Sequence, residues 1–293
     1  GPLSRLARFL EPPRLRTRED DEDRRATWLE LFLDLVFVGA IAQVALTLSH
    51  DPTAAGFGRY LVLFVPIGWA WAGFTFYATR FDTDDLAYRL LVLLGMFAVA
   101  ALASTVPDAL HGGQNAFVLA YVSVRLVLIV LYVRVYRDVE AARPVARWFI
   151  FMFGLAVVDW LISLAVPVPW KYLLWGLALG LEHFAPIRAW RLIRDAPVHP
   201  RHIPERFGLL IIIVLGEAVI GVVLGTESAS WTLLSGAAAF GGFVAAAAIW
   251  WLYFDFLDAS AVTRNVLSGI TFVYAHYFVA AGIAALGVGV KLT

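Results

Sequence analysis

The chain consists largely of long apolar stretches of about 20 residues that recur from Trp28 almost to its end. A helix of about 20 apolar residues crosses the roughly 30 Å hydrocarbon core of a bilayer. Hydrophobic residues make up 61% of the chain and charged residues only 16%, whereas soluble proteins carry about 25% charged residues. Backbone polar groups must be paired within lipid, and stretches of this length pair them as helices. The sequence therefore predicts a bundle of transmembrane helices.

Charged residues, prolines and glycines divide this apolar region into nine predicted spans. The spans cover residues 28–49, 59–79, 88–106, 115–136, 145–166, 170–190, 206–225, 231–254 and 266–290. The predicted fold class is all-α, a polytopic helical membrane protein with nine transmembrane helices.

The basic residues are distributed unevenly between the two sides of this arrangement. Nineteen of the 23 basic residues fall on the side of the N-terminus, and one, Arg125, lies inside the fourth span. The opposite side has only Arg59, Lys171 and Lys291. Cytoplasmic loops carry the excess of lysine and arginine, so the sequence predicts a bacterial inner (plasma) membrane protein with a cytoplasmic N-terminus.

This topology can be tested directly because the chain has no cysteine of its own. Single cysteines at Thr17 and Ala196 are expected to resist an impermeant thiol reagent in intact cells, because both positions lie on the predicted cytoplasmic side. A cysteine at Ser228 is expected to react. The opposite labelling pattern would contradict the topology.

The predicted organisation is a tail followed by two unequal repeats. Residues 1–27 form a cytoplasmic tail, in which Gly1-Pro2 without an initiator methionine resembles the remnant of a protease site. Residues 28–190 form a first six-helix repeat, residues 191–205 a cytoplasmic linker, and residues 206–293 the first three helices of a second, incomplete repeat. Matching landmarks suggest this parallel repeat, because Glu30-Leu31-Phe32 and Glu205-Arg206-Phe207 open spans that are followed by similar aromatic and aspartate endings. A complete 6+6 bundle would have about twelve helices.

Composition also excludes several function classes. The absence of cysteine removes disulfides, thiolate metal sites and cysteine nucleophiles. The 23 basic and 23 acidic residues balance, and no basic segment with interleaved aromatics offers a nucleic-acid surface. The expected partners are the lipid bilayer and an unknown small-molecule or ion substrate, with no nucleic acid and no cofactor or metal. A homo-oligomer is left open.

Six ionisable residues lie near the predicted bilayer midplane. Such residues are costly in lipid and usually face the interior of a bundle, so each is a functional hypothesis. They are candidates for binding a substrate or a proton: Glu217, Glu182, His183, Asp159, His276 and Arg125. The structural alternative is an interhelical pair between Arg125 and a carboxylate, together with histidines bonded to backbone carbonyls.

A second group of charged residues lies near the predicted cytoplasmic ends of the first, seventh and eighth spans. Glu30 and Asp34 share one face of the first span, and Arg206 and Glu217 share one stripe of the seventh. Asp255 and Asp258 end the eighth span, where the helix dipole opposes negative charge, so we expect Arg264 or Arg206 as their partner. These residues are candidates for a cytoplasmic gate or ion pairs: Glu30, Asp34, Glu205, Arg206, Asp255, Asp258 and Arg264.

Three motifs resemble a known family. They run from Arg25 to Val38 (RATWLELFLDLVFV), from His202 to Gly208 (HIPERFG) and from Val214 to Glu217 (VLGE). Together with the 253–258 and 274–276 segments, they resemble the bacterial low temperature requirement protein A family (LtrA), over nearly everything from Arg24 to about Gly289. The resemblance implies a bacterial polytopic membrane protein that is longer than this chain, but it supplies no activity and no catalytic residue.

The leading functional hypothesis is a secondary transporter or channel-like permease, with proton coupling through the midplane carboxylates. One alternative is an intramembrane enzyme, or a protein that binds a cofactor or lipid, using the midplane glutamate and histidine residues. The other is a membrane sensor or scaffold of the cold or stress response, in which these polar groups are structural.

Overall fold

The computed structural model of the protein describes residues 12–15, 26–82, 84–189, 192, 202–227, 232–257 and 266–291. Within them, the long α-helices are α2 (Trp28–His50), α3 (Ala54–Arg80), α4 (Leu86–Thr105), α5 (Gln114–Asp138), α6 (Arg143–Ile162), α7 (Trp170–Arg188), α9 (His202–Glu227), α10 (Leu233–Phe256) and α12 (Val266–Lys291). Short 3-10 turns η2 (Val106–Asp108), η3 (Glu140–Ala142) and η4 (Ser163–Ala165) lie between some of them.

The prediction of an all-helical membrane protein is confirmed. Each predicted span coincides with one of these helices. Eight of the described helices are long and apolar enough to cross a membrane. The helix outside this group is α7, in which Lys171, Glu182 and His183 interrupt the apolar sequence. Nine membrane crossings and twelve helices in a 6+6 repeat remain predictions.

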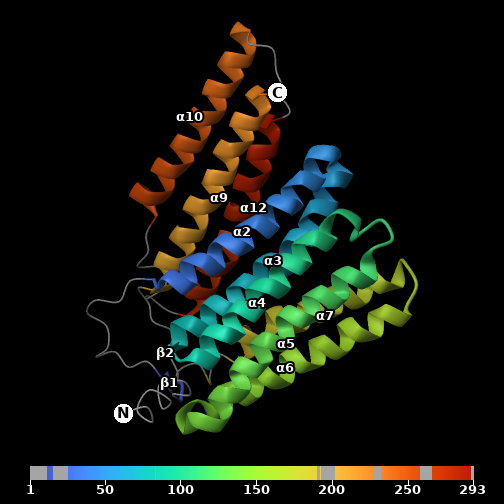
Figure 1. Ribbon diagram of the computed structural model, residues 1–293, viewed down its shortest axis with the longest axis vertical. Coiled ribbons are helices and arrows are strands. Elements are labelled where there is room, and N and C mark those ends of the chain that lie inside the picture. Colours follow the sequence, from blue (N-terminus) through green and yellow to red (C-terminus); the bar gives the residue numbers. More distant parts are fainter. Residues whose placement is uncertain are drawn as a thin grey trace.

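Helix α2 lies at the junction between two groups of helices (Figure 1). It packs against α3 and α4 on one side and against α9 and α12 on the other. Beyond α4, helix α5 packs against α4, α6 against α5, and α7 against α6. Helix α10 packs mainly against α9. Residues at the interface of α2, α3, α9 and α12 therefore join the first six long helices to the last three.

The two groups have similar internal packing. Helix α2 packs against both α3 and α4, and α9 packs against both α10 and α12. The α9–α12 contact is close because glycines face each other, and a Cβ atom added to Gly221 would lie 3.0 Å from the carbonyl oxygen of Gly287. Small residues permit such close approach of membrane helices. The predicted repeat would make α9 the counterpart of α2, and it remains a prediction.

Side-chain capping fixes the start of two helices at the predicted cytoplasmic end. Thr27 and Glu30 form a reciprocal capping box at the start of α2. Asp85 accepts a hydrogen bond from the Tyr88 amide at the start of α4 and also pairs with Arg134 of α5. A short strand pair, β1 (Arg14–Leu15) with β2 (Phe81–Asp82), lies at the same end. Residues 14 and 15 belong to the predicted tail, and this pairing was not predicted from the sequence.

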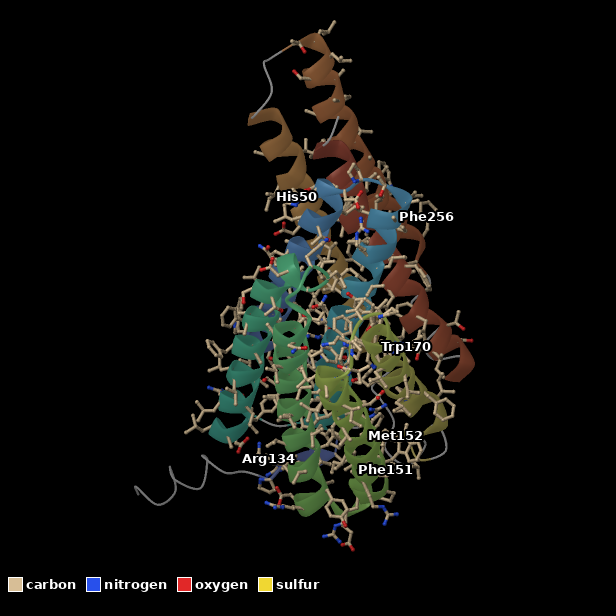
Figure 2. The ribbon with its side chains drawn as sticks, turned by 90° about the vertical axis from the view of Figure 1, so that its right-hand side faces the viewer. His50, Arg134, Phe151, Met152, Trp170 and Phe256 are labelled. Atoms are coloured by element: carbon tan, nitrogen blue, oxygen red, sulfur yellow. The ribbon has the colours of Figure 1, made fainter. Side chains whose placement is uncertain are left out.

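The outer surface of the bundle is apolar, whereas its interior contains charged groups. Phe97, Phe151 and Phe278 are 60–76% exposed, while Arg125 and Arg206 are fully buried. Figure 2 shows His50 in the upper part of the view and Arg134 in the lower part, with many side chains of the bundle between them. This arrangement suits a protein whose surrounding solvent is hydrocarbon.

Candidate functional site

Arg125 and Glu182 form a charged pair inside the bundle. Arg125 lies in the middle of α5 and Glu182 lies on α7, and both side chains are fully buried. Arg125 Nη2 donates a hydrogen bond to Glu182 Oε2. The Tyr121 hydroxyl lies one turn before Arg125, donates to the same Glu182 oxygen over 2.6 Å and accepts from Arg125 Nε over 2.9 Å. We call Arg125, Glu182 and Tyr121 the central pair site.

The central pair site leaves some polar atoms without a partner. Arg125 Nη1 is buried and forms no hydrogen bond, and neither does the nearby Tyr277 hydroxyl of α12, whereas the Trp160 indole of α6 hydrogen bonds to Glu182. Gly73 of α3 covers the guanidinium, so a Cβ atom at this position would lie 3.1 Å from Arg125 Nη1. Buried polar groups are nearly always satisfied in folded proteins. Arg125 Nη1 and the Tyr277 hydroxyl could therefore pair with a group that is not part of the chain.

Aromatic rings join this site to the last three helices. The His183 ring stacks on Trp69 of α3 with centroids 3.9 Å apart. His183 Nδ1 lies 2.8 Å from the Leu179 carbonyl oxygen, and the Tyr274 hydroxyl of α12 donates to the His183 carbonyl oxygen over 2.9 Å. Tyr277 lies against Gly68, where a Cβ atom would come within 2.9 Å of its ring. Movement of α12 relative to α3 and α7 would disturb this aromatic contact.

His276 belongs to α12 and lies outside the central pair site, in contact with α9 and α10. Its Nδ1 is 2.6 Å from the Phe272 carbonyl oxygen, and its Nε2 is 2.9 Å from the Tyr253 hydroxyl. Because a carbonyl only accepts, the neutral ring carries its proton on Nδ1 and accepts from Tyr253 through Nε2. His276 also packs against Phe207 of α9, with centroids 5.0 Å apart.

A second buried ion pair joins α2 to α9. Arg206 Nη2 donates to Asp34 Oδ1 over 2.7 Å, and both side chains are fully buried. Trp71 of α3 donates its indole N–H to the same oxygen over 2.7 Å. Asp34 Oδ2 and two nitrogens of Arg206 remain without a partner. The structure therefore brings three helices together around one carboxylate.

Further charged groups extend this pair toward the ends of α2 and α9. His202 Nδ1 lies 3.1 Å from Glu205 Oε2, and His202 Nε2 lies 3.8 Å from Glu30 Oε2. Glu205 also accepts from the backbone amide of Ala26, which directly precedes the α2 capping box. We call Glu30, Asp34, His202, Glu205 and Arg206 the α2–α9 charge cluster.

The remaining predicted site residues lie apart from these centres. Asp159 of α6 is 8% exposed, and its Oδ2 has no partner. Glu217 of α9 is only partly buried, in contrast to Arg206 on the same helix. The six midplane candidates thus do not meet at one point, since the structure joins Arg125 to Glu182 but places His276 with Tyr253.

Arg206, one of the two partners expected for Asp255 and Asp258, pairs with a different residue in the structure. Arg206 pairs with Asp34, and Asp255 at the end of α10 is exposed. The reason is geometric, since Arg206 lies on the buried face of α9 that packs on α2. Asp258 and Arg264 lie outside the described residues.

Some buried polar residues were not among the site residues predicted from the sequence. Tyr121 could have been found from its spacing to Arg125, because residues four apart share a helix face. Trp71 and Tyr277 carry no such local signal. Arg80 of α3 is 3% exposed and lies over the ring of Phe149, 5.6 Å from its centroid. Within the described residues, no three of the histidine, aspartate and glutamate side chains lie close enough to hold a metal ion.

Comparison with known proteins agrees with the motif resemblance. The family model described as bacterial low temperature requirement A protein (LtrA) matches residues 25–293. A relative from Rhizobium meliloti (strain 1021), named Uncharacterized protein RA0937, is 27% identical over 301 residues, which covers 93% of this chain and 70% of the relative. No solved structure matches the chain.

Proposed function

This chain belongs to the bacterial low temperature requirement A (LtrA) family, and we propose that it is a secondary permease of the bacterial inner membrane. Its substrate would be a small polar molecule or ion that binds at the central pair site. In this proposal the N-terminus is cytoplasmic, as the distribution of basic residues predicts.

The observation that carries the proposal is the set of unpaired polar atoms around Arg125 and Glu182. A buried ion pair is weak evidence for stability, because an apolar pair of similar volume often stabilises a protein as well or better. A purely structural pair would also gain from satisfying its remaining donors and acceptors. Arg125 Nη1 and the Tyr277 hydroxyl instead remain available. A ligand with both an acceptor and a donor, such as a small zwitterion, would satisfy them.

The α2–α9 charge cluster supplies the second element of a permease, a closure between the site and the cytoplasm. Asp34 and Arg206 join α2 of the first group to α9 of the second. Separating the two helices would break this pair and hydrate both charges. The closed state would be stabilised by the ion pair, and the open state by water around the two separated charges. Alternating access needs two such states.

Proton coupling is part of this proposal. Glu182 is the buried carboxylate of the central pair site, and His183 follows it directly on α7. Protonation of Glu182 would weaken its attraction to Arg125 and free the guanidinium for an anionic group of the substrate. Glu217 is partly buried on α9, where a proton could reach it more easily than Glu182.

A second candidate function is a membrane sensor or scaffold of the cold or stress response. A specific observation favours it, because the Arg125–Glu182 pair and the carbonyl bonds of His183 and His276 match the structural alternative. The two functions differ in what they require of the charges. A scaffold needs only the packing, whereas a permease needs the charges themselves.

A ligand screen tests the permease directly. Purified protein in detergent is heated with a panel of amino acids, organic anions and organic amines, and each compound that raises the unfolding temperature is tested for uptake into proteoliposomes under a pH gradient. Ligand at 100 times its Kd adds about 2.7 kcal/mol to the stability of the folded state. We expect a stabilising compound that fails to stabilise a variant with Arg125→Gln and Glu182→Gln together. A panel that stabilises neither protein, or both equally, would contradict the proposal.

Glu217 provides a separate test of proton coupling. The Glu217→Gln variant keeps the size of the side chain and removes its titration. Because Glu217 is partly exposed and outside the buried pairs, we expect an unfolding temperature close to that of the wild type. We expect uptake of the stabilising compound to lose its dependence on the pH gradient. Uptake that still follows the gradient, measured at several external pH values, would remove Glu217 from the coupling mechanism.

A further inference from the structure

A large apolar groove lies away from the central pair site, between α3 and α7. Its volume is about 690 Å³, within the 300–1,000 Å³ typical of ligand sites. The residues that line it come from the first half of α3, the segment before α5 and the first turns of α7: Gly58, Arg59, Leu61, Val62, Val65, Leu110, Tyr172, Trp175, Gly176 and Leu179. Val62 is 46% exposed, so the groove opens onto the apolar outer surface of the bundle.

Two basic residues lie at or next to this groove. Arg59 lies on its edge and forms an ion pair with Asp51. Lys171 directly precedes the lining residue Tyr172, is only 6% exposed, and donates to the neutral amide oxygen of Asn115. Within the described residues, no carboxylate lies within ion-pair distance of Lys171. A buried ammonium without a counter-ion is costly, so this place favours a negative group from outside the chain.

The position of these two cations is unusual for this protein. On the predicted outer side of the membrane the whole chain carries only three basic residues, and two of them are Arg59 and Lys171. Arg59 lines the apolar groove, and Lys171, which is not a lining residue itself, directly precedes the lining residue Tyr172. Apolar walls next to a cation that has no carboxylate partner are complementary to an amphiphile with a hydrocarbon chain and an anionic headgroup.

We propose that the α3–α7 groove binds an anionic phospholipid of the outer leaflet. One acyl chain would lie along Val62, Val65 and Leu179, and the phosphate would lie at the rim near Lys171 and Arg59. Tyr172 and Trp175, near the start of α7, are of the residue types that are enriched at membrane interfaces. Because α7 also carries Glu182, a bound lipid would hold the helix that supplies half of the central pair.

Two glycines allow a clean test of the groove. A Cβ atom at Gly176, which lines the groove, meets no atom within 4 Å, so Gly176→Phe would place a ring at the groove without a clash at its Cβ atom. Gly39 on α2 is also exposed and also meets nothing within 4 Å, but it does not line the groove. Gly39→Phe is therefore the matched control for a new exposed phenylalanine in a helix.

The experiment is native mass spectrometry of delipidated protein in detergent, titrated separately with phosphatidylglycerol, phosphatidylcholine and palmitate. We expect one phosphatidylglycerol to bind wild type and Gly39→Phe alike, and Gly176→Phe to bind it about tenfold more weakly, because chain contact is lost. Lys171→Gln and the more exposed Arg59→Gln should each reduce the preference for phosphatidylglycerol over phosphatidylcholine while retaining binding of the chain.

Several outcomes would overturn the proposal. Equal binding to wild type and Gly176→Phe would remove the groove as the binding site. Equal affinity for phosphatidylglycerol and phosphatidylcholine in the wild type would remove the anionic headgroup. Palmitate that binds as tightly as phosphatidylglycerol would make the ligand a free fatty acid instead of a phospholipid. None of these readouts depends on transport, so they are independent of the proposed permease function.

Discussion

Replacement of Arg206 by glutamine is expected to destabilise the protein strongly. The substitution leaves the carboxylate of Asp34 buried at 0% exposure with no cation beside it. Removing one partner of a buried ion pair typically costs about 3–5 kcal/mol, because the remaining charge is neither hydrated nor paired. Trp71 still donates to Asp34 Oδ1, but one neutral donor does not replace a guanidinium. The measurement is thermal unfolding of purified protein in detergent.

The matched control is an ion pair of the same chemistry in a different environment. Arg89 donates to Asp84 with two nitrogens, and the two side chains are 56% and 66% exposed. Exposed pairs contribute about 0–1 kcal/mol, so Arg89→Gln should leave the unfolding temperature nearly unchanged. The double variant Asp34→Asn with Arg206→Gln removes both buried charges and should recover most of the loss. Equal effects of Arg206→Gln and Arg89→Gln would show that the α2–α9 pair is hydrated.

The sequence alone was sufficient to predict the helices. Spans were found because hydrocarbon demands about 20 apolar residues per crossing, and each predicted span coincides with a helix of the structure. Only the sixth, α7, lacks the apolarity of a membrane-spanning helix, because it carries the polar residues that face the interior. The apolar signal is thus weakest in the helix that contributes Glu182.

The partners of the buried charges were harder to predict. Local spacing reveals which residues share a helix face, but the pairing of Asp34 with Arg206 joins residues 172 positions apart. That pairing depends on how α9 packs against α2, which no periodicity encodes. The same limit explains Glu217, whose spacing to Arg206 is helical although Arg206 is fully buried and Glu217 only partly buried. The position of each charged residue along its helix could be predicted from the sequence. The distant helix that its side chain faces could not.

The central pair distinguishes the two proposed functions most sharply. Glu182→Gln leaves Arg125 fully buried without a counter-charge, and we expect a loss of about 3–5 kcal/mol of stability. Adding Arg125→Gln removes the second charge, so the unfolding temperature should largely return.

Permease and scaffold then predict different behaviour for this double variant. If the charges bind substrate, the folded double variant will neither be stabilised by the compound that stabilises the wild type nor take it up into proteoliposomes. If the pair is only structural, the compound that stabilises the wild type will also stabilise the refolded double variant, because the compound does not bind to these two charges. A double variant that stays unstable would indicate that Tyr121, whose hydroxyl bonds both charged partners, needs them for its own burial. In that case Tyr121→Phe added to the double variant should restore the unfolding temperature, because the third polar group is then removed as well.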